Sequence, residues 1–242
     1  MDGYARRSSF GTACGALVLG LALDKWRGIT GRAAGWSVCR LAGVTATTGS
    51  AGRVALTFDD GPDPIYTPMV LDVLARRGVR ATFFAVGEAA ARHPRLVRRI
   101  RDEGHTIGSH TRSHPDMWTL SPLDVRRQYL EGRAMVEEAA EMEVLLVRPP
   151  KGWLDVRSGW TLRSAGMRPV LWNACTDDWE PGATVASILE AVDPIPADAI
   201  VLLHDGIQRP EAPAALDRSA TVAALDGLVD RVWAANAALV AL

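Results

Sequence analysis

The sequence predicts an α/β fold, a barrel of roughly six or seven βα units in one domain. From residue 54 onward, short apolar runs of strand character alternate with longer segments that have helical periodicity. Polar side chains follow several of these apolar runs directly, at the place where an α/β barrel keeps its functional residues. With 242 residues, the chain can bury an ample core without disulfides or a structural metal.

The expected strands are the apolar runs at residues 54–58, 81–86, 106–109, 144–147, 169–171 and 200–203, with a last one at 238–242. Between them, Pro68 begins a helix that ends at Gly78, and a helix with arginines on its outer face ends at Gly104. Ser121 and Pro122 are a capping residue and a first helical residue, and they begin a helix that reaches residue 142. Further helices are expected at 157–165, 185–192 and 219–237.

Residues 1–50 differ in charge from the rest of the chain. They are basic, the remainder is acidic, and the whole chain has a net charge of −1. Arg6 and Arg7 precede the uncharged apolar run 10–23, an order typical of a secretory signal, although a spanning helix needs about 17 residues or more. We therefore expect an exported or membrane-associated protein, with residues 10–23 as the attachment. The alternative is a cytoplasmic protein with an N-terminal helical extension.

We place a linker at residues 45–50 and the catalytic domain at 51–242, and we expect a monomer. The near-neutral net charge argues against a nucleic-acid partner, because binding to nucleic acid requires a basic face. Cys14, Cys39 and Cys175 are too few and too scattered for a disulfide framework or a cysteine-rich zinc site.

Two adjacent carboxylates, Asp59 and Asp60, follow the first apolar run and precede a turn at Gly61 and Pro62. Carboxylates are costly at the rim of an apolar core unless something pairs with them. Taken alone, the four residues are more often a plain polar turn. The functional interpretation therefore depends on the later stretches of the chain.

His110 and His114 follow another strand, and Pro115 argues for a loop there instead of a helix. Imidazole nitrogens and carboxylate oxygens are good zinc ligands, and a hydrolytic site needs protein ligands plus an open position. Two unrelated histidines are the alternative. Their place at a strand end, which they share with the Asp59–Asp60 pair, favours a common site.

Three more stretches carry polar residues after apolar runs. Arg148 leaves a strand before two prolines, and an arginine held there can lower the pKa of a nearby carboxylate. Asp178 and Trp179 share one loop, and the indole offers a flat apolar wall for a sugar ring, although plain packing is the commoner role. His204 ends the strand 200–203 and is suited to proton donation near neutral pH.

In this order and spacing, the stretches resemble the motifs of the polysaccharide deacetylases, carbohydrate esterase family 4, which share the NodB homology domain. The resemblance covers residues 52–240. It implies a deformed barrel of about seven βα units and a divalent metal, most often Zn²⁺, with Co²⁺ or another divalent ion as the alternative. The implied reaction is hydrolysis of an N-acetyl, or an O-acetyl, group on a peptidoglycan-like or chitin-like glycan, which is the implied partner.

The resemblance also implies a role for single residues. Asp59 matches the general base and His204 the general acid, while Asp60, His110 and His114 match the metal ligands. Arg148 matches the residue that orients the base. The positions that correspond to substrate contacts are Pro150, Lys151, Trp179 and Leu202; Lys151 would supply a backbone N–H for the oxyanion, and Leu202 the floor of the pocket for the acetyl methyl group.

Two residues depart from the family pattern. Lys151 stands where many members have tyrosine, which places a cation at the groove. Cys175 stands where the family often has a carboxylate thought to hold the acid histidine. Asp177 and Asp178 are both candidates to replace it, and our hypothesis is that Asp178 or a water molecule does so. Two other functions stay open: the same site acting on a non-sugar amide or cyclic imide, and a carbohydrate-binding protein with little turnover.

Overall fold

A computed structural model describes residues 43–208 and 213–242 of the chain. These residues form one parallel sheet with the strand order β5-β4-β3-β2-β1-β7-β6, and β8 pairs with β1. The strands are β1 (Arg53–Asp59), β2 (Thr82–Ala85), β3 (Thr106–Ser109), β4 (Leu146–Val147), β5 (Arg168–Pro169), β6 (Ala174–Cys175), β7 (Ile200–His204) and β8 (Ala238–Leu239). Between β5 and β6 the described residues make no strand pairing. The sheet is thus a curled, open barrel, which confirms the predicted α/β fold.

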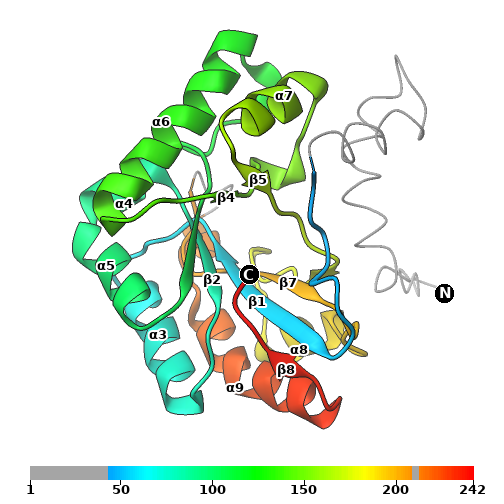
Figure 1. Ribbon diagram of the computed structural model, residues 1–242. Coiled ribbons are helices and arrows are strands. Elements are labelled where there is room, and N and C mark those ends of the chain that lie inside the picture. Colours follow the sequence, from blue (N-terminus) through cyan, green and yellow to red (C-terminus); the bar gives the residue numbers. More distant parts are fainter. Residues whose placement is uncertain (1–42, 209–212) are drawn as a thin grey trace, which may run out of the picture.

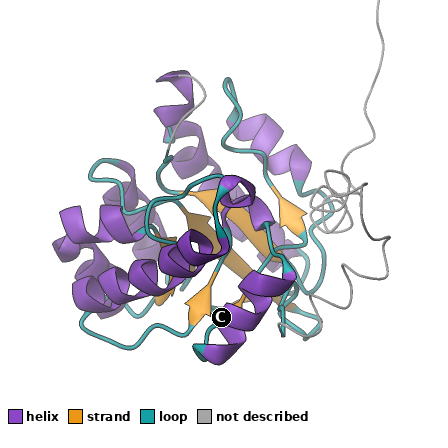
Figure 2. Cartoon of the chain, turned by 90° about the horizontal axis from the view of Figure 1, so that it is seen from above, coloured by secondary structure: helices purple, strands orange, loops and turns teal. Residues whose placement is uncertain are grey.

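Helices surround the strands on the outside of the curl (Figures 1 and 2). They are α3 (Tyr66–Arg77), α4 (Gly87–Arg92), α5 (Pro94–Asp102), α6 (Pro122–Ala140), α7 (Val156–Ser164), α8 (Val185–Ala191) and α9 (Ser219–Ala234), with short 3₁₀ turns η1 (Met117–Thr119), η2 (Pro150–Gly152) and η3 (Pro213–Leu216). Among the described residues no helix is long and apolar enough to span a membrane. The apolar run 10–23 lies outside the described residues.

Local chemistry explains most of the helix ends. The Ser121 side chain accepts the Asp124 N–H at the start of α6, and Gly78 ends α3 in the left-handed conformation, both as predicted. The start of α3 at Tyr66, earlier than the predicted Pro68, reflects Asp63, whose Oδ1 accepts the N–H of Ile65 (2.8 Å) and of Tyr66 (2.9 Å).

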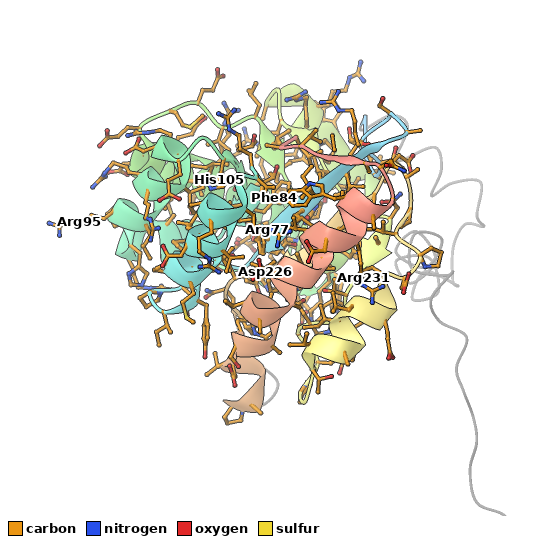
Figure 3. The ribbon with its side chains drawn as sticks, turned by 90° about the horizontal axis from the view of Figure 1, so that it is seen from below. Arg77, Phe84, Arg95, His105, Asp226 and Arg231 are labelled. Carbon is orange, nitrogen blue, oxygen red and sulfur yellow. The ribbon has the colours of Figure 1, made fainter. Side chains whose placement is uncertain are left out.

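The arginines of α5 lie on its outer face, as expected. Arg95 points away from the body of the molecule, and Arg99 pairs with Asp72 of α3 at 2.6 Å (Figure 3). Arg77 and Asp226 form a similar bridge between α3 and α9, with Nη1 3.3 Å from Oδ1. Exposed ion pairs of this kind contribute little to stability, so the arginine run is a solvated surface.

Three parts of the chain differ from the expectation. Helix α4 was not predicted because its six residues show no apolar stripe. Strand β6 lies in a stretch that we expected to be a loop. It has only two residues, which pair with β7, and so short a strand gives no sequence pattern. The expected linker at residues 45–50 is partly packed against the domain. Thr45 N–H donates to Pro169 O at 3.0 Å. Ala46, and Val44 just before the linker, contact the apolar cluster inside the curl, which includes Ala55 and Leu202.

Alternation along β1 and β7 decides which side chains enter the curl. Val54, Leu56 and Phe58 join the cluster beneath the outer helices, so the alternate residues Ala55, Thr57 and Asp59 face the interior. Strand β7 behaves in the same way and places Leu202 and His204 inside. Asp59 and His204 are register partners on these neighbouring strands.

Gly132 of α6 allows the helix to touch the loop that carries the two histidines. A Cβ at Gly132 would lie 2.3 Å from the Thr111 carbonyl carbon and 2.4 Å from Arg112 N. Both are backbone atoms that cannot turn away. The close approach therefore requires glycine here, although glycine disfavours a helix interior.

We expect Gly132→Ala to lower the free energy of unfolding by about 1–3 kcal/mol, because overpacking against backbone outweighs the gain in helix propensity. Urea unfolding followed by circular dichroism measures this. Gly227→Ala in α9 is the matched control, since its methyl would meet only the movable end of Leu189, at 3.0 Å. A Gly132→Ala protein as stable as wild type would contradict the packing argument.

Candidate active site

Asp60, His110 and His114 converge at the carboxyl ends of β1 and β3. Each offers one ligand atom, and these atoms lie within 4.8 Å of one another. Asp60 Oδ1 is 3.5 Å from His110 Nε2 and 3.4 Å from His114 Nε2. Atoms bound tetrahedrally to one zinc-sized ion stand roughly 3.4 Å apart, so the spacing fits a shared divalent metal.

Gln208 makes two hydrogen bonds to Asp60. Its Oδ2 accepts the Gln208 backbone N–H at 3.0 Å, and its carbonyl oxygen accepts the Gln208 side-chain amide, also at 3.0 Å. Oδ1 is buried and has no hydrogen-bond partner among the described residues. A buried carboxylate oxygen left unpaired is costly, and a cation between it and the two imidazoles would satisfy it.

His110 is held in the form that a metal ligand needs. Its Nδ1 lies 2.7 Å from the Arg148 carbonyl oxygen, which can only accept, so Nδ1 carries the proton and Nε2 keeps its lone pair. Burial and the neighbouring His114 lower the pKa of His110 to about 3. The ring is therefore neutral near neutral pH, as a metal ligand must be.

His114 is positioned by its loop. Its φ angle of 51° is left-handed, as is that of Thr111 at 68°, so the chain folds back on itself between the two rings. The Thr111 hydroxyl accepts the His114 N–H at 3.3 Å, and Gln128 of α6 accepts the Ser113 N–H at 3.1 Å. This is the folded-back loop that the sequence predicted before Pro115.

Asp59 forms a buried ion pair with Arg148. Arg148 Nη1 donates to Asp59 Oδ1 at 2.8 Å and also to the Thr57 hydroxyl at 2.8 Å. The other carboxylate oxygen, Oδ2, lies 3.7 Å from His110 Nε2, beside the cluster of ligand atoms. Burial raises the pKa of Asp59, and Arg148 opposes this shift. Asp59 thus has one oxygen anchored and one facing the metal position.

His204 forms a second buried pair, with Asp178. Its Nδ1 lies 2.7 Å from Asp178 Oδ1, and its backbone N–H donates to Asp178 Oδ2 at 2.9 Å. Burial disfavours the charged ring, but the Asp178 carboxylate outweighs it and raises the pKa of His204 to about 9. The ring is therefore protonated near neutral pH, with Nε2 as its other N–H donor.

Comparison with known proteins shows which family the chain belongs to. Residues 46–170 match the family described as polysaccharide deacetylase. A chitooligosaccharide deacetylase from Sinorhizobium fredii is 42% identical over 186 residues, or 74% of this chain and 85% of that protein. This chain belongs to the polysaccharide deacetylase family.

Two further relatives agree with this assignment. A peptidoglycan N-acetylglucosamine deacetylase from Bacillus cereus is 40% identical over 174 residues, or 71% of this chain and 78% of that protein. The crystal structure of a peptidoglycan N-acetylglucosamine deacetylase superposes with a TM-score of 0.75 at 31% identity, and covers 85% of this chain and 92% of that one. The family resemblance in the sequence is confirmed.

The departure from the family pattern at Cys175 has a clear structural outcome. Asp178, and not Asp177, is the carboxylate beside His204, in agreement with our hypothesis. Cys175 is buried on β6, where its thiol donates to Asp177 Oδ1 at 3.3 Å. His204 therefore has a carboxylate partner that does not depend on position 175.

The four positions predicted to contact substrate lie in different surroundings. Trp179 packs edge-on against His204, with ring centroids 5.3 Å apart, and Leu202 is buried inside the curl. Pro150 is buried in η2, while the Lys151 side chain is exposed and pairs with Asp116 at 2.8 Å. Lys151 has a left-handed backbone, with φ at 55°. Pro150, Lys151 and Trp179 follow the carboxyl ends of β4 and β6, whereas Leu202 lies within β7, two residues before its end.

Sequence patterns missed the supporting residues. Gln208 and Thr221, which donates to Asp178 Oδ2 at 2.9 Å, have no motif around them. Arg218 donates to the Asp178 carbonyl oxygen and is also buried. Only the tertiary contacts of these three residues show that they support Asp60 and Asp178. His105, in contrast, is structural, because its Nδ1 accepts the Ala81 N–H at 3.1 Å (Figure 3).

We expect Asp178→Asn to move the basic limb of the activity profile to lower pH by at least about one unit, because the carboxylate that raises the pKa of His204 is lost. A pH–rate profile of kcat measures the shift. Asp177→Asn is the matched control and should leave the limb in place. An unchanged limb in Asp178→Asn would refute the pairing.

We expect Gln208→Ala to weaken metal affinity about tenfold, since outer contacts orient metal ligands. Titration with a chromophoric chelator as competitor measures the dissociation constant. The melting temperature of the metal-free protein serves as the control, because loss of one partly exposed amide should barely change it. Unaltered metal affinity would show that the backbone N–H alone orients Asp60.

Proposed function

We propose that this chain is a metal-dependent hydrolase that removes acetyl groups from amino sugars of a peptidoglycan-like or chitin-like glycan. The observation that carries the proposal is the grouping of a carboxylate base, a set of metal ligands and a protonated histidine around one point at the rim of the barrel. The deacetylase names of the relatives support the same reaction class.

We propose Zn²⁺ as the resident ion, held by Asp60, His110 and His114. Two neutral imidazoles and one carboxylate are a common donor set for catalytic zinc, which keeps an open position for water or substrate. Such an ion polarises a carbonyl group and lowers the pKa of bound water. Co²⁺ has similar ligand preferences, so metal analysis of the purified protein decides between the two.

Asp59 is suited to take the proton of the attacking water. Its free Oδ2 faces the metal position, while the Arg148 contact to Oδ1 fixes the carboxylate plane and favours its charged form. Asp59 then holds that proton while the new C–O bond forms. The backbone N–H of Lys151 and the buried Leu202 are the groups we assign to the oxyanion and to the acetyl methyl group.

His204 supplies the proton that the leaving amine requires. With Nδ1 bound to Asp178, the Nε2–H is the group free to donate to the sugar nitrogen as the C–N bond breaks. The products are acetate and the free amine of the sugar. Trp179, in contact with His204, is placed to lie beside the reacting sugar ring.

Export, with attachment through residues 10–23, and a monomeric state remain part of this proposal. Export rests on the sequence, where a basic pair precedes an apolar run. A polymeric cell-wall or chitin-like substrate would lie outside the cell, which is consistent with export.

We expect the metal-loaded protein to release acetate from N-acetylglucosamine oligomers, and Asp59→Asn to lower kcat by about 10²–10⁴-fold, the usual contribution of a general base. An enzyme-coupled acetate assay measures the rate. Bound metal, quantified by mass spectrometry, should stay near one ion per chain in the variant, because Asp59 is not assigned as a ligand. A wild-type protein that binds metal but releases no acetate from any glycan would overturn the proposal.

A further inference from the structure

The turn after β1 carries two of the candidate site residues, and its backbone is held in an uncommon conformation. Asp60 has a left-handed backbone, with φ at 72°. Residues other than glycine rarely adopt this conformation, and it persists where the surrounding structure holds it. The direction of a side chain follows from its backbone, so whatever holds this turn also aims Asp60 Oδ1 at His110 and His114.

The segment after β7 packs against this turn. The Asp205 N–H donates to the Asp59 carbonyl oxygen at 3.3 Å. A Cβ at Gly61 would overlap both carboxylate oxygens of Asp205, so the carboxylate lies directly against the Gly61 backbone. The next residue is as close, because a Cβ at Gly206 would lie 3.1 Å from the Asp60 carbonyl oxygen. Asp205 therefore blocks movement of the turn toward β7.

Thr67 of α3 fixes the position of the Asp205 carboxylate. Its hydroxyl donates to Asp205 Oδ2 at 2.5 Å and accepts the Asp63 backbone N–H at 2.8 Å. Both side chains are buried, and Asp205 Oδ1 has no hydrogen-bond partner among the residues that the structure describes. Breaking the bond to Oδ2 would leave a second buried oxygen unpaired, which is unfavourable. The bond thus links the end of the turn, at Asp63, to the carboxylate that lies against its middle.

We propose that Thr67 and Asp205 are positioning residues for the proposed metal ligand Asp60. Their hydrogen bond holds the turn in the conformation that brings Asp60 Oδ1 to the two imidazoles. Neither residue belongs to the group of ligand atoms, so they act on the geometry of the site and not on its donor set. Gln208 differs from them, because it bonds Asp60 directly. The inference rests on the metal site of the proposed function, and metal binding tests it without turnover.

Thr67→Val removes the hydroxyl with little change of side-chain shape, whereas Thr67→Ser keeps the hydroxyl. In the full chain we expect Thr67→Val to bind Zn²⁺ about tenfold more weakly and Thr67→Ser to bind it like the wild type, since groups that orient metal ligands have effects of this size. Titration against a chromophoric chelator, well below the melting temperature, measures the dissociation constant. With Co²⁺ as the probe, the visible absorption bands should shift in Thr67→Val only, because they report ligand geometry.

Thr82→Val is the matched control. Thr82 is also buried, and its hydroxyl accepts the Leu242 N–H at 3.0 Å. It begins β2, however, and so lies at the opposite end of the parallel strands from the metal ligands. Thr82→Val should lower the melting temperature and leave the Zn²⁺ affinity unchanged. A merely structural role of Thr67 would give this same result.

A double-mutant cycle tests whether the two residues act together. Asp205→Ala should also lose about tenfold in Zn²⁺ affinity, and Thr67→Val added to it should lose little more, because both changes remove one hydrogen bond. If Asp205→Ala does not fold, the comparison of Thr67→Val with Thr67→Ser decides.

Wild-type Zn²⁺ affinity in Thr67→Val, an equal loss in Thr67→Ser, or additive losses in the double variant would overturn the positioning role. Metal binding that depends on the Thr67 hydroxyl, in a protein that releases no acetate, would support this role and count against the proposed function alone.

Discussion

The buried ion pair between Arg148 and Asp59 is the interaction on which the site depends. A guanidinium that is fully buried must find a partner for its N–H groups, and Arg148 finds them in Asp59, the Thr57 hydroxyl and the carbonyl oxygens of Val170 and Leu171. It thereby ties β1 to the segment after β5 across the open curl. Loss of one partner would leave a buried charge uncompensated, which typically costs about 3–5 kcal/mol. Stability and base orientation therefore come from the same contacts.

Around the proposed metal position, too, single residues serve more than one purpose. The carbonyl oxygen of Arg148 sets the tautomer of His110, so Arg148 orients both the proposed base, Asp59, and a proposed metal ligand. Gln208 occupies one oxygen of Asp60 and leaves the other unpaired, and Gln128 of α6 holds the loop that carries His114. Protein groups thus hold the three side chains in the arrangement that a shared ion would require, and such support reduces the reorganisation that binding costs.

The two departures from the family pattern affect different parts of the site. At Cys175 the loss of a carboxylate leaves the His204–Asp178 pair intact, because Asp178 is also held by Thr221 and Arg218. At Lys151 the change lies at the rim, where the ammonium pairs with Asp116 and contacts Trp118. The His204–Asp178 pair is therefore kept, and the change at Lys151 falls on the exposed rim.

The sequence by itself determined the class of fold, because short apolar runs that alternate with helical stripes are local properties of the sequence. The sequence also predicted the candidate site residues at the strand ends, from Asp59 to His204. Each of them is a polar side chain that follows an apolar run, and that pattern can be recognised along the sequence. Short elements such as α4 and β6 were not visible, because a few residues carry no periodicity.

Only the tertiary structure decided that Asp178 holds His204, that Gln208 and Arg218 belong to the site, and that Thr67 bonds Asp205. Each of these contacts joins different segments of the chain, and strand register and helix packing, not the local sequence, set their distances.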